Sequence, residues 1–143
     1  MKNLTKALSL CLVIITLGLC FASCKEEPLV IKDSDTFIVI KTTEKALDGK
    51  ENMMLIDYME MLRDDGELEF KVNSGMITSI NGYDNPADYS KCWMLYTSDS
   101  DFSSSEWGTV EYQGVEYGSA ILGAEMLVIK PNQTYIWVFK SFE

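Results

Sequence analysis

Side chains capable of nucleophilic chemistry are scarce in this sequence. It has no histidine among its 143 residues, so neither a Ser/His nor a Cys/His nucleophile can be assembled. Three of the four cysteines lie within the first 24 residues, and the fourth, Cys92, stands in an apolar stretch where a free cysteine usually acts as a small hydrophobe. Paired carboxylates alone are too common to indicate catalysis. We therefore predict a protein that is not an enzyme and requires no cofactor.

Three acidic side chains in and beside a serine-rich stretch are candidate metal ligands: Asp99, Asp101 and Glu106. They could hold calcium loosely, but their spacing lacks the glycine and the terminal bidentate glutamate of an EF-hand loop. A solvated polar loop over residues 98–105 is the preferred interpretation, and we predict no metal site.

Aromatic side chains near predicted connections are the candidate ligand-binding residues, together with the asparagine of a turn. Tyr83 follows an Asn-Gly turn signal that begins at Asn81, and Trp107 follows the serine-rich stretch. Ligands are commonly met at such connections. Trp93 and Tyr96 lie three apart on a predicted strand, so they point to opposite faces. A place in the core or at hinges is the more common role for such residues and is the alternative.

The first 24 residues have the pattern of an export signal. Two lysines precede an apolar run over residues 7–22, and the small residues Ala22 and Ser23 stand directly before Cys24. A basic start, an apolar core and a small residue before a cleavage point are typical of a secretory signal peptide. Small residues before a cysteine also resemble the lipobox of bacterial lipoproteins, although Phe21 stands where a leucine is commoner.

We therefore predict a signal peptide at residues 1–23 and a lipidated tether at residues 24–35. The likeness to lipoproteins implies a diacylglyceryl thioether on Cys24, and two acyl chains hold a protein stably on a bilayer. The predicted location is extracytoplasmic, anchored through Cys24 to the bacterial membrane at the cell surface. An uncleaved membrane helix, which needs roughly 20 apolar residues, and plain secretion are the alternatives. Residues 29–31 could instead pair as an edge strand.

The balance of charges limits the choice of partner. The formal net charge is −10, and the first 23 residues carry two lysines and no acidic residue. Such a surface repels nucleic acid and anionic lipid headgroups, so we predict neither polynucleotide binding nor docking on a membrane surface.

The body of the chain predicts one helix among several strands. Four apolar residues recur at the helical spacing i, i+3, i+4, i+7: Leu55, Tyr58, Met59 and Leu62. The predicted helix spans residues 52–64, with Asn52 as N-cap and Gly66 as terminator. Strands are predicted at residues 36–42, 67–73, 76–80, 91–97, 125–130 and 134–139, with a hairpin at 108–117 turning at Gln113-Gly114.

The first and last of these strands are apolar on both faces, which indicates central, buried positions. One strand, one helix and then several strands is an α+β plan. We predict a single domain over residues 36–143 with a β-grasp arrangement. In it, one amphipathic helix packs on a mixed sheet whose first and last strands are central.

Four segments occur in an order shared with a known group: residues 75–82 (GMITSING), 92–96 (CWMLY), 117–120 (YGSA) and 137–139 (WVF). Together they resemble the transcobalamin-like C-terminal domain family of bacterial exported proteins, a β-grasp group, over residues 36–141. The chain departs from that pattern at residues 98–108 and 131–133.

The resemblance implies a fold that hosts a flat, amphipathic ligand near Trp93, with a corrinoid (cobalamin-like) as the first candidate. In vitamin B12 carriers the related domain closes over a corrinoid held mainly by a helical domain, which this chain lacks. The predicted function is a lipid-anchored extracytoplasmic module that binds a small soluble ligand. The alternative is a protein-interaction or display module at the cell surface without a small-molecule ligand.

Overall fold

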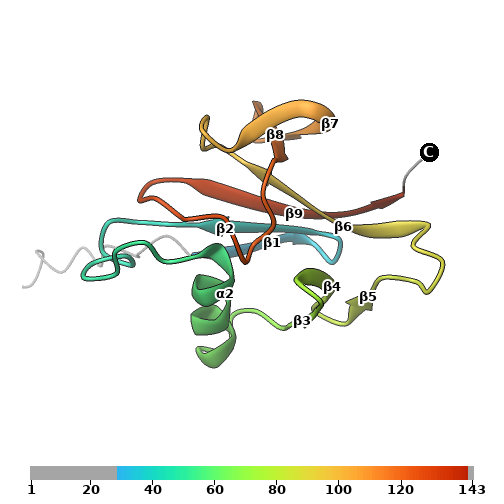
Figure 1. Cartoon of the computed structure of the whole chain (residues 1–143), viewed down its shortest axis with the longest axis horizontal. Coiled ribbons are helices and arrows are strands. Elements are labelled where there is room, and N and C mark those ends of the chain that lie inside the picture. The colour runs from blue at the N-terminus through green and yellow to red at the C-terminus, as the bar shows by residue number, and fades with distance from the viewer. Residues whose placement is uncertain (1–28, 142–143) are drawn as a thin grey trace, which may run out of the picture.

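The computed structural model describes residues 29–141, which form two antiparallel sheets and one helix (Figure 1). In spatial order the large sheet consists of β1 (Val30–Ser34), β2 (Phe37–Lys41), β9 (Thr134–Ser141), β6 (Lys91–Thr97), β8 (Val115–Ala120) and β7 (Ser103–Tyr112). The small sheet consists of β3 (Phe70–Asn73), β4 (Met76–Ile80) and β5 (Tyr83–Asp84). Helix α2 (Leu55–Asp64) connects the two.

The predicted α+β fold with a mixed β-grasp sheet is wrong. Every strand pairing within residues 29–141 is antiparallel, and the structure is mostly β, with 48% in strands and a single short helix. The first and last predicted strands, β2 and β9, do pair, with Val39 opposite Ile136. They run antiparallel, however. Apolar residues on both faces of a strand indicate that the strand is buried, but they do not indicate its direction. The edge beyond β2 is taken by β1, which begins within the predicted tether.

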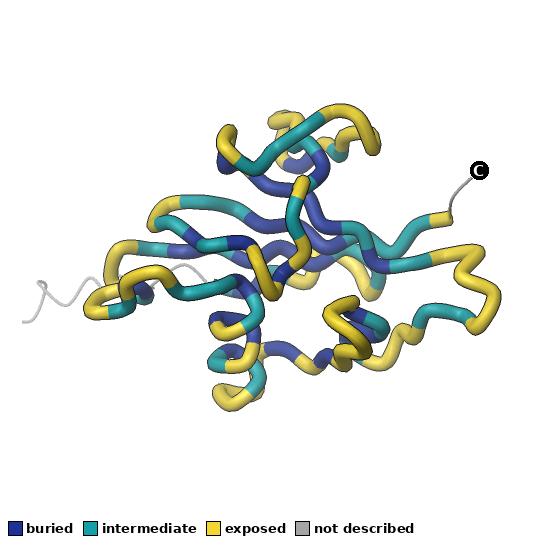
Figure 2. Tube along the Cα trace, in the orientation of Figure 1, coloured by how far each residue is buried: buried dark blue, intermediate teal, exposed yellow. Residues whose placement is uncertain are grey.

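The large sheet is covered on both faces. Figure 2 shows the buried positions concentrated in its middle strands and along one side of α2. One face packs against α2 and the small sheet through apolar residues that include Ile38, Leu95 and Tyr135. The other carries a second cluster: Val39, Tyr96, Tyr112 and Ile136.

The β7–β8 hairpin covers this second face by leaving the plane of the sheet (Figure 1). Strand β8 pairs with β6 at only Tyr96 and Thr97, and the β7–β8 register shifts between Ser104 and Thr109. The hairpin turns at Gln113-Gly114 as predicted, with positive φ at both residues. Tyr112 thereby reaches Phe37, with 5.9 Å between the ring centroids.

Helix α2 buries the predicted face, which is Leu55, Tyr58, Met59 and Leu62. Its predicted N-cap is wrong, because Asn52 has a φ of 56° and the cap is Met54, whose N–H donates to the Asp57 carboxylate. At the C-terminus Gly66 has a φ of 77° and donates to the Arg63 carbonyl, while Glu67 donates to the Leu62 carbonyl. This is a Schellman motif, so Gly66 ends the helix as predicted.

Two further strand predictions differ from the structure. Residues 125–130 form no strand ladder. Their alternating apolar side chains pack under α2 instead, and the carbonyl of Leu127 accepts the N–H of Leu55 at 2.8 Å. Residues 98–105 are not entirely a loop, since β7 begins at Ser103. Within residues 29–141, no helix has the length and apolar character required to span a membrane.

Candidate functional site

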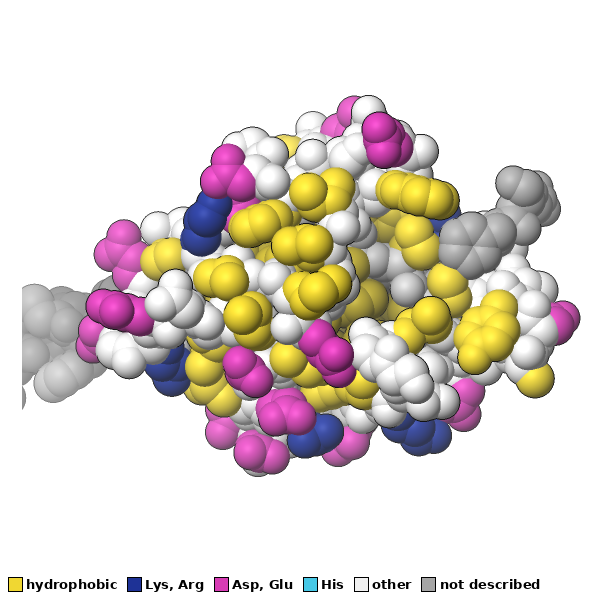
Figure 3. All heavy atoms as spheres, viewed as in Figure 1, with side chains coloured by type: hydrophobic (Ala, Val, Ile, Leu, Met, Phe, Trp, Pro, Cys, Tyr) yellow, Lys and Arg dark blue, Asp and Glu magenta, His cyan; other side chains and the backbone are white. Residues whose placement is uncertain are grey.

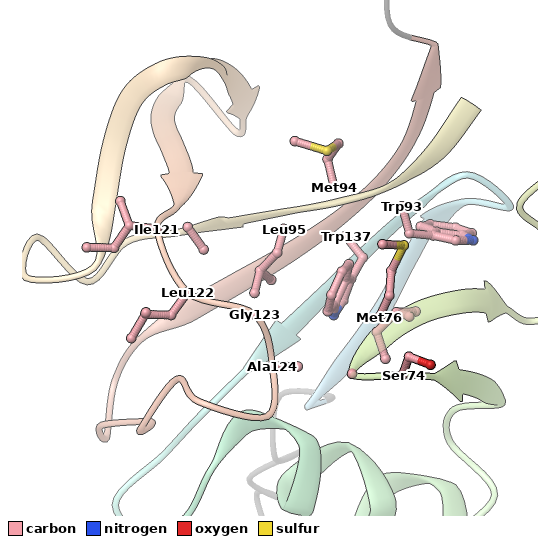
Figure 4. Close-up of a pocket in the computed structure, with 13 residues that line it drawn as sticks. Ser74, Met76, Trp93, Met94, Leu95, Ile121, Leu122, Gly123, Ala124 and Trp137 are labelled. Atoms are coloured by element: carbon pink, nitrogen blue, oxygen red, sulfur yellow. The ribbon is translucent and has the colours of Figure 1, made fainter. Parts of the chain in front are cut away.

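An open apolar hollow of about 350 Å³ lies beside β6, on the face of the large sheet that also carries α2 (Figure 4). Its wall is formed by residues 93–95 of β6 and Trp137 of β9, by the β3–β4 turn at residues 74–77, and by residues 120–124, where the chain leaves β8. Figure 3 shows apolar side chains gathered around a depression on this side of the molecule.

The hollow exists because, among residues 29–141, no strand lies beside β6 along most of one edge. Strand β9 pairs with β6 from Lys91 to Thr97, whereas β8 pairs only with its last two residues. The side chain of Asn85 partly fills the gap: its Oδ1 accepts the N–H of Trp93 at 3.3 Å, and its Nδ2 donates to the Ile77 carbonyl at 3.2 Å. An amide group thus connects β4 to β6 where a peptide unit of a neighbouring strand would stand.

Two tryptophans in the wall, each only 4% exposed, differ in their hydrogen bonding. Trp93 donates from Nε1 to the Tyr83 carbonyl at 2.8 Å and packs against Phe139, with 5.3 Å between ring centroids. The buried Nε1–H of Trp137 finds no acceptor among residues 29–141. In Figure 4 the nitrogen end of this indole points into the space beside Ala124. An unpaired buried donor costs about 1–3 kcal/mol, but this nitrogen is covered in the free protein, so an acceptor would reach it only if the neighbouring side chains moved.

The rim of the hollow is apolar and exposed, with one acidic residue. Met76 and Ile121 are 50% and 55% exposed and belong to segments more than forty residues apart. The Glu125 carboxylate lies over Gly75, where a Cβ would stand 2.9 Å from Oε2. Gly75 also has a φ of 81°, which favours glycine. The site therefore combines an apolar interior with a negative charge at its edge.

Three of the five predicted ligand-binding residues lie together at this end of the molecule, but only Trp93 lines the hollow. Asn81 has a structural role in its turn, since its Oδ1 accepts the Glu69 N–H at 3.1 Å. Tyr83 supports Trp93 through its carbonyl, while its hydroxyl donates to Asp35 at 2.9 Å, which raises the pKa of that hydroxyl.

The structure separates the other two from the hollow. Tyr96 is buried on the opposite face, as the three-residue spacing predicted, and its hydroxyl accepts from Lys140 Nζ at 2.8 Å. Trp107 is 67% exposed on β7, within the irregular part of the hairpin. Cys24, the predicted lipidation site, lies outside the described residues.

Sequence reasoning missed most of the wall, notably Trp137, Met76 and Ile121. Trp137 was assigned to the core from its apolar strand. The one local signal is the run at residues 120–124 (AILGA), which is apolar although all of it after Ala120 lies outside the strands. The approach of residues 74–77 to 120–124 depends on tertiary structure that no local pattern encodes.

The remaining candidates for chemistry have structural partners. Burial raises the pKa of the Cys92 thiol, whose Sγ lies 3.9 Å from Met94 Sδ. Asp99 and Asp101, considered above as loose calcium ligands, instead contact Lys130 Nζ at 2.9 and 2.5 Å. Within residues 29–141, no group of three or more potential metal ligands comes together.

Comparisons of the chain with protein families, with curated proteins and with solved structures found no match. The resemblance to the transcobalamin-like family therefore stays a prediction. What the chain can bind has to be inferred from the hollow and its surroundings.

Proposed function

We propose that this protein is a binding module on the bacterial cell surface, held by lipid on Cys24, and that its hollow receives an apolar group of the ligand. The observation that carries the proposal is the open hollow itself, whose wall consists mainly of apolar side chains, two of which are exposed at its rim. The Trp137 N–H lies covered beside it without an acceptor among residues 29–141. A ligand that combines an apolar group with a hydrogen-bond acceptor would gain a bond there once the wall side chains move apart.

The exposed rim supplies the driving force for binding. Met76 and Ile121 are half exposed, and covering roughly 100 Å² of apolar surface contributes about 2.5 kcal/mol. The volume of about 350 Å³ lies near the lower end of the range for ligand sites. It suits one ring or one branched side chain. A corrinoid is much larger and would insert only an edge or a substituent, so it stays in the proposal as a ligand to be tested.

Binding without catalysis is supported by the residues near the hollow. The chain has no histidine, and the thiol of Cys92 has a raised pKa, which reduces the reactive thiolate at neutral pH. The large side chains of the wall offer contact area and the Trp137 N–H, but no base or nucleophile: Trp93, Trp137, Met76 and Ile121.

Tryptophan emission provides a direct test. Substituting the exposed Trp107 (W107F) leaves Trp93 and Trp137 as the reporters, both in the wall. We expect a saturable change in emission when the full chain is titrated with N-acetylleucinamide, a water-soluble apolar amide. Cobinamide and cobalamin are tested by the shift of their corrin absorbance.

Two variants control for unspecific effects in this titration. Ile121→Lys should abolish the response because it places a charge on the rim. Val115→Lys changes a similarly exposed residue next to the hairpin turn and should leave the response intact. If no compound gives a saturable response, or if the two lysine variants behave alike, the hollow is not a binding site.

The anchor has a separate test. Radiolabelled palmitate should enter the wild-type protein in the bacterial host and should not enter Cys24→Ser. Equal labelling of both would contradict lipidation at this residue.

A further inference from the structure

We propose that the ligand is an extended, cationic peptide segment that pairs with the free edge of β6 and inserts one apolar side chain into the hollow. This inference rests on the proposed function and names the chemical class of its ligand.

One edge of β6 is open. On the side away from β9, pairing with β8 covers only Tyr96 and Thr97, so no strand of residues 29–141 lies beside Lys91–Leu95 there. Met94 shows that the hollow reaches this edge: its side chain packs on the second face, yet the residue also lines the hollow. A peptide added to a strand edge gains affinity from main-chain hydrogen bonds and specificity from pockets for its side chains.

Backbone polar groups of β6 face this open edge. The N–H of Trp93 points away from β9, since it donates to Asn85 Oδ1 at 3.3 Å. Backbone groups of alternate residues point the same way, so those of Lys91 and Leu95 face this edge too. The Asn85 amide already accepts this N–H, so a peptide unit that pairs with β6 would replace that bond. The Trp137 N–H has no acceptor among residues 29–141, and it becomes a donor for a peptide carbonyl once the inserted side chain displaces the atoms that cover it.

The charge of the chain favours a cationic partner. The chain has a formal net charge of −10, and the carboxylate of Glu125 lies at the rim of the hollow over Gly75. A second copy of the chain would bring the same negative charge to the contact, as would nucleic acid or an anionic lipid surface. Among macromolecules, a protein segment rich in lysine or arginine is complementary to this surface.

Synthetic peptides test each argument separately, with the emission of the full-chain W107F protein in a neutral detergent as the readout. The reference peptide is end-blocked Lys-Val-Lys-Leu-Lys-Val-Lys. A second peptide replaces every lysine by glutamate, a third replaces the leucine by serine, and a fourth carries N-methyl groups on alternate backbone nitrogens, which removes the donors needed for strand pairing.

We expect saturable binding of the reference peptide and at least tenfold weaker binding of the other three. Glu125→Gln should weaken the reference peptide about two- to fivefold, as expected for an exposed ion pair. Ile121→Lys should abolish its binding and Val115→Lys should preserve it.

Equal affinity for the N-methylated peptide would overturn pairing with β6, and equal affinity for the serine peptide would overturn insertion into the hollow. Binding of the glutamate peptide would overturn the choice of a cationic partner. If N-acetylleucinamide binds but the reference peptide does not, the peptide inference fails while the proposed function stands. If neither binds, both fail.

Discussion

Replacing each wall tryptophan by phenylalanine should give two different changes in stability from the same substitution. Trp93 and Trp137 are equally buried, at 4% exposure, and both belong to the core that faces α2. Loss of the larger ring costs about 1–2 kcal/mol at either position through lost burial and a small cavity. At Trp93 the substitution also removes the 2.8 Å bond to the Tyr83 carbonyl, worth about 0.5–1.5 kcal/mol. Trp93→Phe should therefore lower the free energy of unfolding by about 2–3 kcal/mol.

At Trp137 the same substitution removes a buried donor that has no acceptor among residues 29–141. Relief of that cost, about 1–3 kcal/mol, offsets the lost packing of about 1–2 kcal/mol. Trp137→Phe should therefore lower the free energy of unfolding by at most about 1 kcal/mol, and at the upper end of the relief it should raise it. Urea unfolding of the full chain, followed by far-UV circular dichroism, measures both values without depending on tryptophan emission. Equal destabilisation by the two variants would refute the reasoning, because it would mean that the Trp137 N–H has a partner.

Trp137→Phe should affect the affinity for the peptide more than it affects the stability of the free protein. If the Trp137 N–H serves the ligand, Trp137→Phe should weaken the reference peptide about fivefold or more, the value of one neutral hydrogen bond, while leaving the free protein nearly as stable. A donor whose removal costs affinity and not stability acts on the ligand. Unchanged affinity would return Trp137 to a purely structural role.

Three other predictions concern the parts that support the hollow. Burial raises the pKa of Tyr135 to about 12, above the unfolded value near 10. The stability that this raised pKa contributes is complete below pH 10 and is lost as the pH rises towards 12, so the free energy of unfolding should fall by about 2 kcal/mol over that range. In Tyr135→Phe this part of the fall should be absent. Gly118→Ala should destabilise the protein by about 1–3 kcal/mol in thermal unfolding, because its Cβ would meet the Ser103 hydroxyl and lie 2.8 Å from the Ser104 carbonyl oxygen. Gly49→Ala is the control: its Cβ would meet no atom within 4 Å, so only the positive φ of this position should cost stability. Iodoacetamide should modify the Cys92 thiol more slowly in folded than in urea-unfolded protein at pH 8, as its burial and raised pKa require; equal rates measured by mass spectrometry would contradict this.

Local patterns in the sequence predicted burial well and strand direction poorly. The face of α2 and its end at Gly66 follow from periodicity and glycine chemistry within a dozen residues, so both predictions were confirmed. The apolar character of β2 and β9 predicted their burial and pairing, but not their antiparallel orientation. The alternation at residues 125–130 resembled a strand because packing under a helix can produce the same pattern.

The hollow could not be predicted from local patterns, for a different reason. The family resemblance predicts a ligand near Trp93, and this residue does line the wall of the hollow. Met76 and Ile121 become neighbours only through the register of distant strands, and no spacing within the chain encodes that contact. The exposure of Ile121 is visible only after β8 has been placed.

A single feature of the topology connects the stability of the large sheet with the proposed site. Strand β8 leaves β6 after two pairs, and the β7–β8 hairpin can then turn over the second face and bury Tyr112 against Phe37. Because β8 turns away there, it does not pair with the rest of β6, and the hollow beside Trp93 is left open. A variant that extended the β6–β8 ladder would satisfy more backbone groups, but it would uncover the second face and close the hollow. The short pairing is therefore required for both the second cluster of the core and the hollow, which explains why an open strand edge can persist in a folded domain.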